Sequence, residues 1–206
     1  MITFKKIRYK NFLSTGNIPI EVELNKSATT LIVGSNGSGK STLLDALCYA
    51  LFNKPFRIIK KDQMVNTINN GDTLVEVEFE VGTNQYMIRR GIKPNLFEIY
   101  QNEKLINQDA SNIDYQKYLE QNIMKLNYRS FIQVVILGSS SYEPFMKMKP
   151  RYRREVVEEI LDIRVFGLMD LLLRSQQSDL QKKLTEVRHQ AELIKTKYET
   201  EAKHLK

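Results

Sequence analysis

The chain has 206 residues, of which 42% are hydrophobic, enough for a packed core in one domain with an extension or in two small domains. Its 31 lysines and arginines outnumber its 24 acidic residues, and the net charge of +7 is compatible with a polyanionic partner such as nucleic acid. The single cysteine excludes an internal disulfide and favours a reducing compartment, and no apolar run is long enough to span a bilayer, so we expect a cytoplasmic protein with no membrane partner.

The first fifty residues predict strands followed by a helix. Residues 18–24 alternate between apolar and polar side chains, which indicates a strand with one buried face. Residues 29–33 (TTLIV) form a short β-branched apolar run and predict a buried strand, and residues 41–52 (STLLDALCYALF) have the pattern of an apolar helix. Four apolar residues near the start indicate one further strand with imperfect alternation: Ile2, Phe4, Ile7 and Tyr9.

A phosphate-binding loop lies between the predicted strand and helix. Residues 34–41 (GSNGSGKS) match the pattern G-x-x-x-x-G-K-[ST] in its required strand–loop–helix context. Glycines allow backbone N–H groups to surround an anion, and the helix N-terminus adds the positive end of its dipole. Lys40 can reach the β- and γ-phosphates of ATP, and the Ser41 hydroxyl can complete the coordination shell of Mg²⁺.

The middle of the chain predicts a small β-rich lobe. Residues 53–70 read as an irregular connection, and residues 74–81, 85–90 and 96–101 predict a three-stranded meander. Residues 112–126 predict a helix. The apolar run 131–137 fits either a buried strand or the end of a helix, because periodicity does not separate the two over so short a stretch.

The pattern changes at Pro150, which can open a helix over residues 151–163. A heptad repeat follows, with polar residues at most other positions, and a narrow apolar stripe of this kind favours a coiled coil over an ordinary amphipathic helix. The repeat runs to the last residue without a helix-ending signal, so we expect a chain cut within a helix whose partner strand lies elsewhere. The repeat consists of Leu173, Leu180, Leu184, Val187, Ala191, Ile194, Tyr198 and Leu205. We therefore divide the chain into an ATP-binding lobe, residues 1–149, and a helical segment with the start of a coiled coil, residues 150–206.

The sequence lacks a complete set of residues for ATP hydrolysis. Phosphate-loop ATPases use an acidic residue at the end of a second apolar strand to hold Mg²⁺. The corresponding sequence pattern is four apolar residues followed by Asp-Asp or Asp-Glu, and this sequence does not contain it. Residues 137–141 (LGSSS) only faintly match a signature of the LSGGQ type. We expect the chain alone to bind ATP without hydrolysing it efficiently.

The order of these features resembles the N-terminal half of an SMC-like ATPase head in the double-strand-break repair branch, the SbcC type, and within it the ATPase subunits of T-even-type bacteriophage recombination endonucleases. The resemblance is carried by residues 10–14 (KNFLS), the phosphate loop, residues 44–47 (LDAL) and residues 131–146 (FIQVVILGSSSYEPFM) with 158–161 (EEIL). It implies an α/β fold in which a mixed β-sheet surrounds the phosphate-loop helix, followed by a helical segment and an outgoing coiled-coil helix.

The resemblance also implies a function and partners. ATP would drive dimerisation of two heads, each completed by a C-terminal lobe, and this would control access of DNA ends to a metal-dependent nuclease in recombination and repair. If the chain is phage-encoded, the compartment is the host-cell cytoplasm. Residues assigned to the nucleotide are Gly34, Ser35, Asn36, Gly37, Ser38, Gly39, Lys40, Ser41 and Thr42, with Lys40 catalytic and Ser41 on Mg²⁺, and Val65, Asn66 and Thr67 beside the first helix.

Two positions depart from the family pattern. Leu13 stands where the family often has an arginine, and the glutamine loop, which would approach the γ-phosphate and Mg²⁺, aligns near Ser139. Gln133, six residues earlier, is interpreted as a polar residue packed at a lobe boundary.

Basic clusters are the candidates for contact with DNA, because they attract phosphates without reading sequence. Arg57, Lys60 and Lys61 form the favoured cluster, since they follow the nucleotide-bound helix. Two further clusters can equally be solvated surface: Arg89, Arg90 and Lys93, and Lys147, Lys149, Arg151, Arg153 and Arg154.

Other function classes stay open. An SMC-type ATPase that tethers DNA without a nuclease partner has the same architecture. A scaffold with a vestigial head would not bind Mg-ATP. A small kinase or GTPase would need an acceptor site or an N-K-x-D motif, and neither is present.

Overall fold

The computed structural model describes residues 2–106, 112–136, 143–161 and 163–204. The chain forms two compact units, Met1–Ile160 and Leu161–Lys206. The first unit includes helix α4, Pro150–Ile160, which sequence analysis grouped with the coiled coil. The Glu159 carboxylate explains this difference, because it accepts hydrogen bonds from the backbone N–H and the side-chain amide of Asn127, at 3.1 and 2.9 Å, and ties α4 to the first unit.

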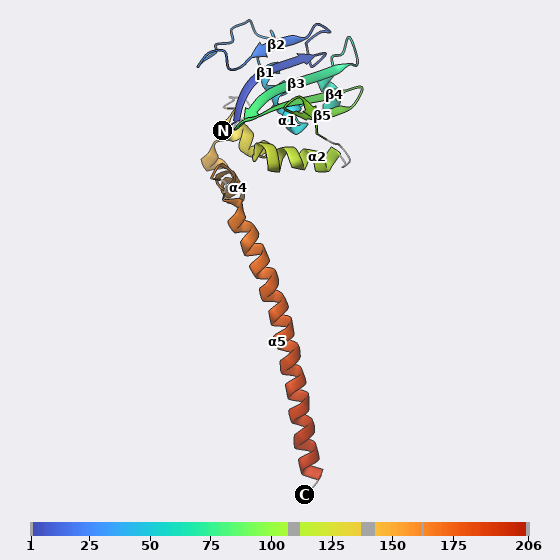
Figure 1. The fold of residues 1–206 in the computed structure, drawn as a ribbon, viewed down its shortest axis with the longest axis vertical. Coiled ribbons are helices and arrows are strands. Elements are labelled where there is room, and N and C mark those ends of the chain that lie inside the picture. The colour runs from blue at the N-terminus through green and yellow to red at the C-terminus, as the bar shows by residue number, and fades with distance from the viewer. Residues whose placement is uncertain (1, 107–111, 137–142, 162, 205–206) are drawn as a thin grey trace. The chain divides into compact units, whose positions relative to one another are not determined.

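A six-stranded sheet organises the first unit, with strand order β2-β1-β3-β4-β5-β6 (Figure 1). The α/β class is confirmed, and so is the three-stranded meander. Every strand pair in the described residues is antiparallel. The strands are β1 Ile2–Lys10, β2 Ile20–Glu23, β3 Thr73–Val81, β4 Asn84–Ile92, β5 Leu96–Gln101 and β6 Lys104–Leu105.

The imperfect alternation of the first strand has a structural cause. The pairing of β1 with β3 shifts register between Phe4 and Lys6, which is the signature of a β-bulge. The shift lets residues three apart face the same core: Ile7 is fully buried, and the Phe4 ring packs against Phe79 and Phe131.

The prediction of a buried strand at residues 29–33 is wrong for this structure. The segment is not a strand, and the side chains of Leu31 and Val33 are 85% and 82% exposed. A strand is buried only when neighbouring strands supply its hydrogen bonds and helices or a second sheet cover its faces, and none of the described strands pairs with this segment. The mixed sheet expected around the phosphate loop is therefore antiparallel as described here.

Helix α1, Thr42–Phe52, covers one face of the sheet by packing against β3 and β4 (Figure 1). Nearly all of its residues are buried, which agrees with its continuous apolar sequence. The predicted helix at residues 112–126 is α2, Asn112–Tyr118, continued by a π-helical turn, η2, Leu119–Met124. The ambiguous run at 131–137 is helical as far as Val134, as part of α3, Tyr128–Val134. Two 3₁₀ turns complete the unit, η1 Lys61–Met64 and η3 Phe145–Lys147.

The second unit is a single helix for most of its length. Helix α5, Arg164–His204, has 41 residues, and the outgoing helix is confirmed. Apolar residues of the heptad repeat are exposed along it, among them Leu180, Leu184 and Ile194. No helix in the described residues is both long and apolar enough to cross a membrane.

Candidate nucleotide-binding site

The phosphate loop adopts a conformation that only glycine accommodates easily at two positions. Gly37 and Gly39 have φ angles of 84° and 91°, in the left-handed region where a Cβ atom is strained. At Gly34 a Cβ atom would lie 2.5 Å from Ser38 Oγ, so the Ser38 side chain would have to move to make room for it. The Lys40 ammonium donates to the carbonyl oxygens of Gly34 and Ser35, both at 2.7 Å, and so lies within the curve of the loop.

A cleft of about 530 Å³ opens beside this loop. Of the residues assigned to the nucleotide, it brings together Asn36, Gly37, Gly39, Lys40, Ser41, Thr42, Val65 and Thr67. Gly34, Ser35, Ser38 and Asn66 do not line it. The remaining walls were not assigned to the nucleotide from the sequence: Leu13, Ser14, Arg57, Ile59 and Gln63.

Asn66 does not line the cleft but stabilises the loops that form its wall. Its buried side chain donates to the carbonyl oxygens of Leu13 and Thr15, at 3.1 and 3.0 Å, and accepts from the backbone N–H groups of Ile68 and Asn69. These bonds use both ends of the amide, so Asn66 fixes the two loops that carry Leu13 and Thr67.

Arg57 is held in the cleft wall by an ion pair with a buried carboxylate. Asp45 on α1 is completely buried and accepts hydrogen bonds from the Arg57 backbone N–H at 2.9 Å and from its Nε–H at 2.6 Å, and the Arg57 Nη2 lies 2.5 Å from the same carboxylate. An acidic residue on an apolar helix face signals a partner of this kind, but the sequence does not say which of the following basic residues it binds. The structure selects Arg57, which sequence analysis assigned to DNA contact.

The residues of the cleft fit a magnesium nucleotide rather than a metal held by the protein alone. No group of three or more histidine, cysteine or acidic side chains in the described residues could hold a metal ion. Mg²⁺ in phosphate-loop proteins takes most of its ligands from water and phosphate, with one hydroxyl from the loop. Ser41 supplies that hydroxyl at the N-cap of α1, where its side chain makes no capping hydrogen bond.

The predicted γ-phosphate contact, Ser139, lies outside the described residues. Gln133 is placed on α3, where its side-chain amide donates to the Glu143 carbonyl oxygen at 2.7 Å.

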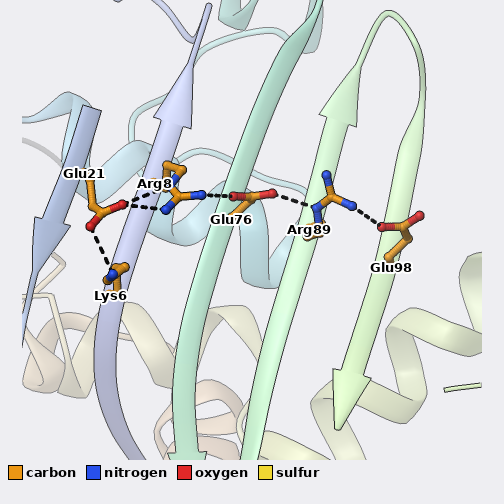
Figure 2. Close-up of polar contacts among 6 residues, drawn as sticks. All are labelled: Lys6, Arg8, Glu21, Glu76, Arg89 and Glu98. Carbon is orange, nitrogen blue, oxygen red and sulfur yellow. Dashed lines mark hydrogen bonds and ion pairs between the residues drawn. The ribbon is translucent and has the colours of Figure 1, made fainter. Parts of the chain in front are cut away.

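The outer face of the sheet carries charges that neutralise one another. Figure 2 shows a ladder across five strands in which Glu21 pairs with Lys6 and Arg8, Glu76 lies between Arg8 and Arg89, and Arg89 reaches Glu98. Arg89 is therefore bound to two carboxylates, whereas Arg90, its neighbour in sequence, points to the buried face. The predicted basic cluster at residues 89–93 is divided between two faces and does not form one phosphate-binding surface.

Comparisons with known proteins agree with this architecture. A protein-family model described as an AAA domain matches residues 6–205. The chain is 42% identical over 182 residues to exonuclease subunit 2 of Escherichia phage RB69, covering 87% of this chain and 32% of that protein. It is 43% identical to exonuclease subunit 2 of Enterobacteria phage T4, covering 81% of this chain and 30% of that protein. It thus spans about a third of the length of these relatives.

More distant similarity extends to archaeal repair proteins. The DNA double-strand break repair Rad50 ATPase of Thermoplasma volcanium is 29% identical over 85% of this chain and 20% of its own length. Among solved structures, an Smc head domain with an extended coiled coil from Pyrococcus furiosus superposes with a TM-score of 0.62. That match has 19% sequence identity and covers 91% of this chain and 48% of the other, so it supports the fold alone.

Proposed function

We propose that the chain, which belongs to the AAA-domain family, is the ATP-binding N-terminal lobe of an SMC-like, Rad50-type head that acts with a metal-dependent nuclease on DNA ends. The observation that carries the proposal is the cleft that joins the phosphate loop to Val65 and Thr67. Relatives named as exonuclease subunits support the nuclease partner over a tethering role without a nuclease.

The chain's own residues would act on the triphosphate through charge and backbone geometry. Lys40 would exchange its two carbonyl partners for β- and γ-phosphate oxygens, which are stronger acceptors because they are charged. Ser41 would contribute its hydroxyl to Mg²⁺, which neutralises phosphate charge when it is bound. Arg57 lines the same cleft, but its charge is already paired with Asp45, so Lys40 is the cation expected to carry the phosphate contact.

Efficient hydrolysis would need groups from elsewhere. No aspartate or glutamate is among the residues that line the described cleft, so it offers no carboxylate to position water or Mg²⁺. A C-terminal lobe and a second head would supply these groups on dimerisation. The chain alone is then expected to bind Mg-ATP and to release phosphate at a rate close to background.

Calorimetric titration of the chain with Mg-ATP tests the first part of the proposal. Lys40→Ala should remove binding, whereas the matched change Lys104→Ala, at an exposed position on β6, should leave it intact. If Lys40→Ala binds as tightly as the original chain, the cleft is not a nucleotide site. Purification from the source cells tests the partner: metal-dependent cleavage of linear DNA should copurify, and its absence from a complex that still binds DNA would favour the tethering function.

A further inference from the structure

A second cleft of about 620 Å³ lies in the first unit at the other end of α1. Its walls come from the end of α1, from η1, from β4 and β5, from α2 and η2, and from α3 and α4. No residue that lines it also lines the nucleotide cleft. Whatever this cleft binds therefore contacts a different set of side chains.

Arg90 provides a buried cation in this cleft. It is 5% exposed, and its guanidinium donates to the Ala50 carbonyl oxygen at 2.9 Å and to the Gln116 side-chain oxygen at 2.6 Å. The guanidinium carbon lies 3.7 Å from the centre of the Phe97 ring. These partners are neutral, and they use two of the five N–H groups that a guanidinium carries.

The positive charge of Arg90 is not balanced by an ion pair with any described carboxylate. Glu120, the acidic residue that acts on Arg90 electrostatically, accepts a hydrogen bond from the Gln116 amide at 2.7 Å instead. Burial lowers the pKa of Arg90 to about 10, which reflects the cost of holding the cation away from water. A buried charge with neutral partners is stabilised by an anion that reaches it.

Two more cations stand at the exposed part of the cleft. Lys54 follows α1 and Lys61 begins η1, and neither forms an ion pair with a residue that the structure describes. The other cations of the cleft are partly engaged: Lys117 lies 3.5 Å from Asp114, and Arg129 lies 3.8 Å from Glu155. Two carboxylates also line the cleft, Glu155, which pairs with Arg129, and Glu120, which accepts a hydrogen bond from Gln116. The cations of the cleft without an ion pair in the described residues are therefore Lys54, Lys61 and Arg90.

From this arrangement we infer a phosphate-binding cleft, in which Arg90, Lys54 and Lys61 hold the phosphodiester backbone of a DNA strand. Phosphate suits a guanidinium because its oxygens match the planar fork of donors. The cleft favours backbone over base recognition, because Arg90 covers the Phe97 ring and the Lys54 ammonium lies 5.8 Å from the centre of the Tyr128 ring. A flexible single strand can bring a phosphate toward a recessed cation more easily than a rigid duplex can. The choice of DNA as the source of the phosphate rests on the proposed function, whereas the phosphate-binding cleft itself does not.

Fluorescence anisotropy with a labelled twelve-residue oligothymidine, in the absence of nucleotide, tests the inference. The double change Lys54→Glu and Lys61→Glu should weaken binding by about tenfold and reduce the slope of log affinity against log salt by about 1.4, the value for two single-strand phosphate contacts. The matched control is Lys26→Glu with Lys104→Glu, which alters the net charge equally at exposed positions outside the cleft and should retain affinity and slope. Equal losses in the two double variants would refute a specific cleft.

Arg90→Gln tests the buried cation, with urea unfolding followed by tyrosine fluorescence to establish that the first unit of the variant folds. It should lose affinity for the oligonucleotide, and if it does not fold, the lysine variant still decides the question. A second titration with inorganic pyrophosphate distinguishes DNA from a small phosphate compound as the ligand. If the oligonucleotide binds and the cleft variants weaken its binding, the inference is supported. If pyrophosphate binds in a way that depends on Lys54 and Lys61 and the oligonucleotide does not bind, DNA is not the ligand. Because no nucleotide is present, failure of ATP binding would leave this result unaffected.

Discussion

Asp45→Asn should separate the stabilising role of the Asp45–Arg57 pair from the shape of the Asp45 side chain. The carboxylate is completely buried, accepts hydrogen bonds from the backbone N–H and the Nε–H of Arg57, and forms an ion pair with its Nη2. Breaking a fully buried ion pair costs about 3–5 kcal/mol, but the Arg57 side chain is 40% exposed and regains water when it is released. The asparagine oxygen can still accept from the Arg57 backbone, so we expect a loss of about 2 kcal/mol in the free energy of unfolding.

Urea unfolding followed by tyrosine fluorescence measures this loss, because the chain has ten tyrosines and no tryptophan. Far-ultraviolet circular dichroism would be dominated by α5 and is less informative about the first unit. Asp72→Asn is the matched control: Asp72 pairs with Lys10 at 2.5 Å, but its side chain is 65% exposed, so the change should cost less than about 1 kcal/mol.

A double-mutant cycle with Arg57→Ala isolates the interaction itself. The sum of the losses in unfolding free energy from the two single changes should exceed the loss from the double change by about 1–3 kcal/mol, because each single change removes the same contact. If Asp45→Asn unfolds within about 0.5 kcal/mol of the original chain, or if the two changes add, the pair does not hold residues 57–65 against α1 and the account of the cleft wall is wrong.

Three further measurements test other parts of the structure. Gly91→Ala should lower the free energy of unfolding by about 2 kcal/mol, because the new Cβ atom would lie 3.0 Å from the Pro94 carbonyl oxygen and 3.1 Å from the Leu96 Cβ. Gly16→Ala is the control, since a Cβ atom there meets nothing within 4 Å and should leave the free energy of unfolding nearly unchanged. Burial raises the pKa of Cys48 to about 12, so a thiol reagent at pH 8 should label it only after urea unfolds the chain, and rapid labelling of the folded chain would contradict its place in the core. Hydrogen bonds from Arg8 and Lys6 lower the pKa of Glu21 in the folded chain. The stability that Glu21 contributes is therefore present above the unfolded pKa near 4.5 and should be lost as pH falls through the lower folded pKa. If a Glu21→Gln chain shows the same dependence of unfolding free energy on acid pH, this account is wrong.

Local patterns were sufficient to predict much of the fold. The meander and the helices at 42–52, 112–118 and 150–160 follow from alternation, apolar periodicity and proline position, all of which act within a few residues. The same reasoning did not place the bulge in β1, because an extra residue is defined by its partner strand. It also predicted a buried strand at residues 29–33, since composition reports a tendency to be buried and not the presence of neighbouring strands.

The candidate sites show the same limit at the level of single side chains. The predicted phosphate loop is contiguous, so eight residues in a row were sufficient to propose it. Arg57, Gln63 and Leu13 meet it only through the fold, and no local pattern distinguishes them from surface residues.

Arg89 and Arg90 make the limit explicit, because they are adjacent in sequence and identical in chemistry. Strand geometry sends successive side chains to opposite faces, so one joins the charge ladder and the other is buried beside the end of α1. A single basic cluster would treat them alike, although Arg89 is neutralised by two carboxylates and Arg90 is buried and forms no ion pair with a described residue. The value of a charge for anion binding depends on what already neutralises it, which is a property of tertiary partners and not of the charge run. For that reason the cleft at Arg90 carries the stronger case for binding phosphate, whereas the arginines that Figure 2 shows on the outer face of the sheet, Arg8 and Arg89, are already paired with carboxylates.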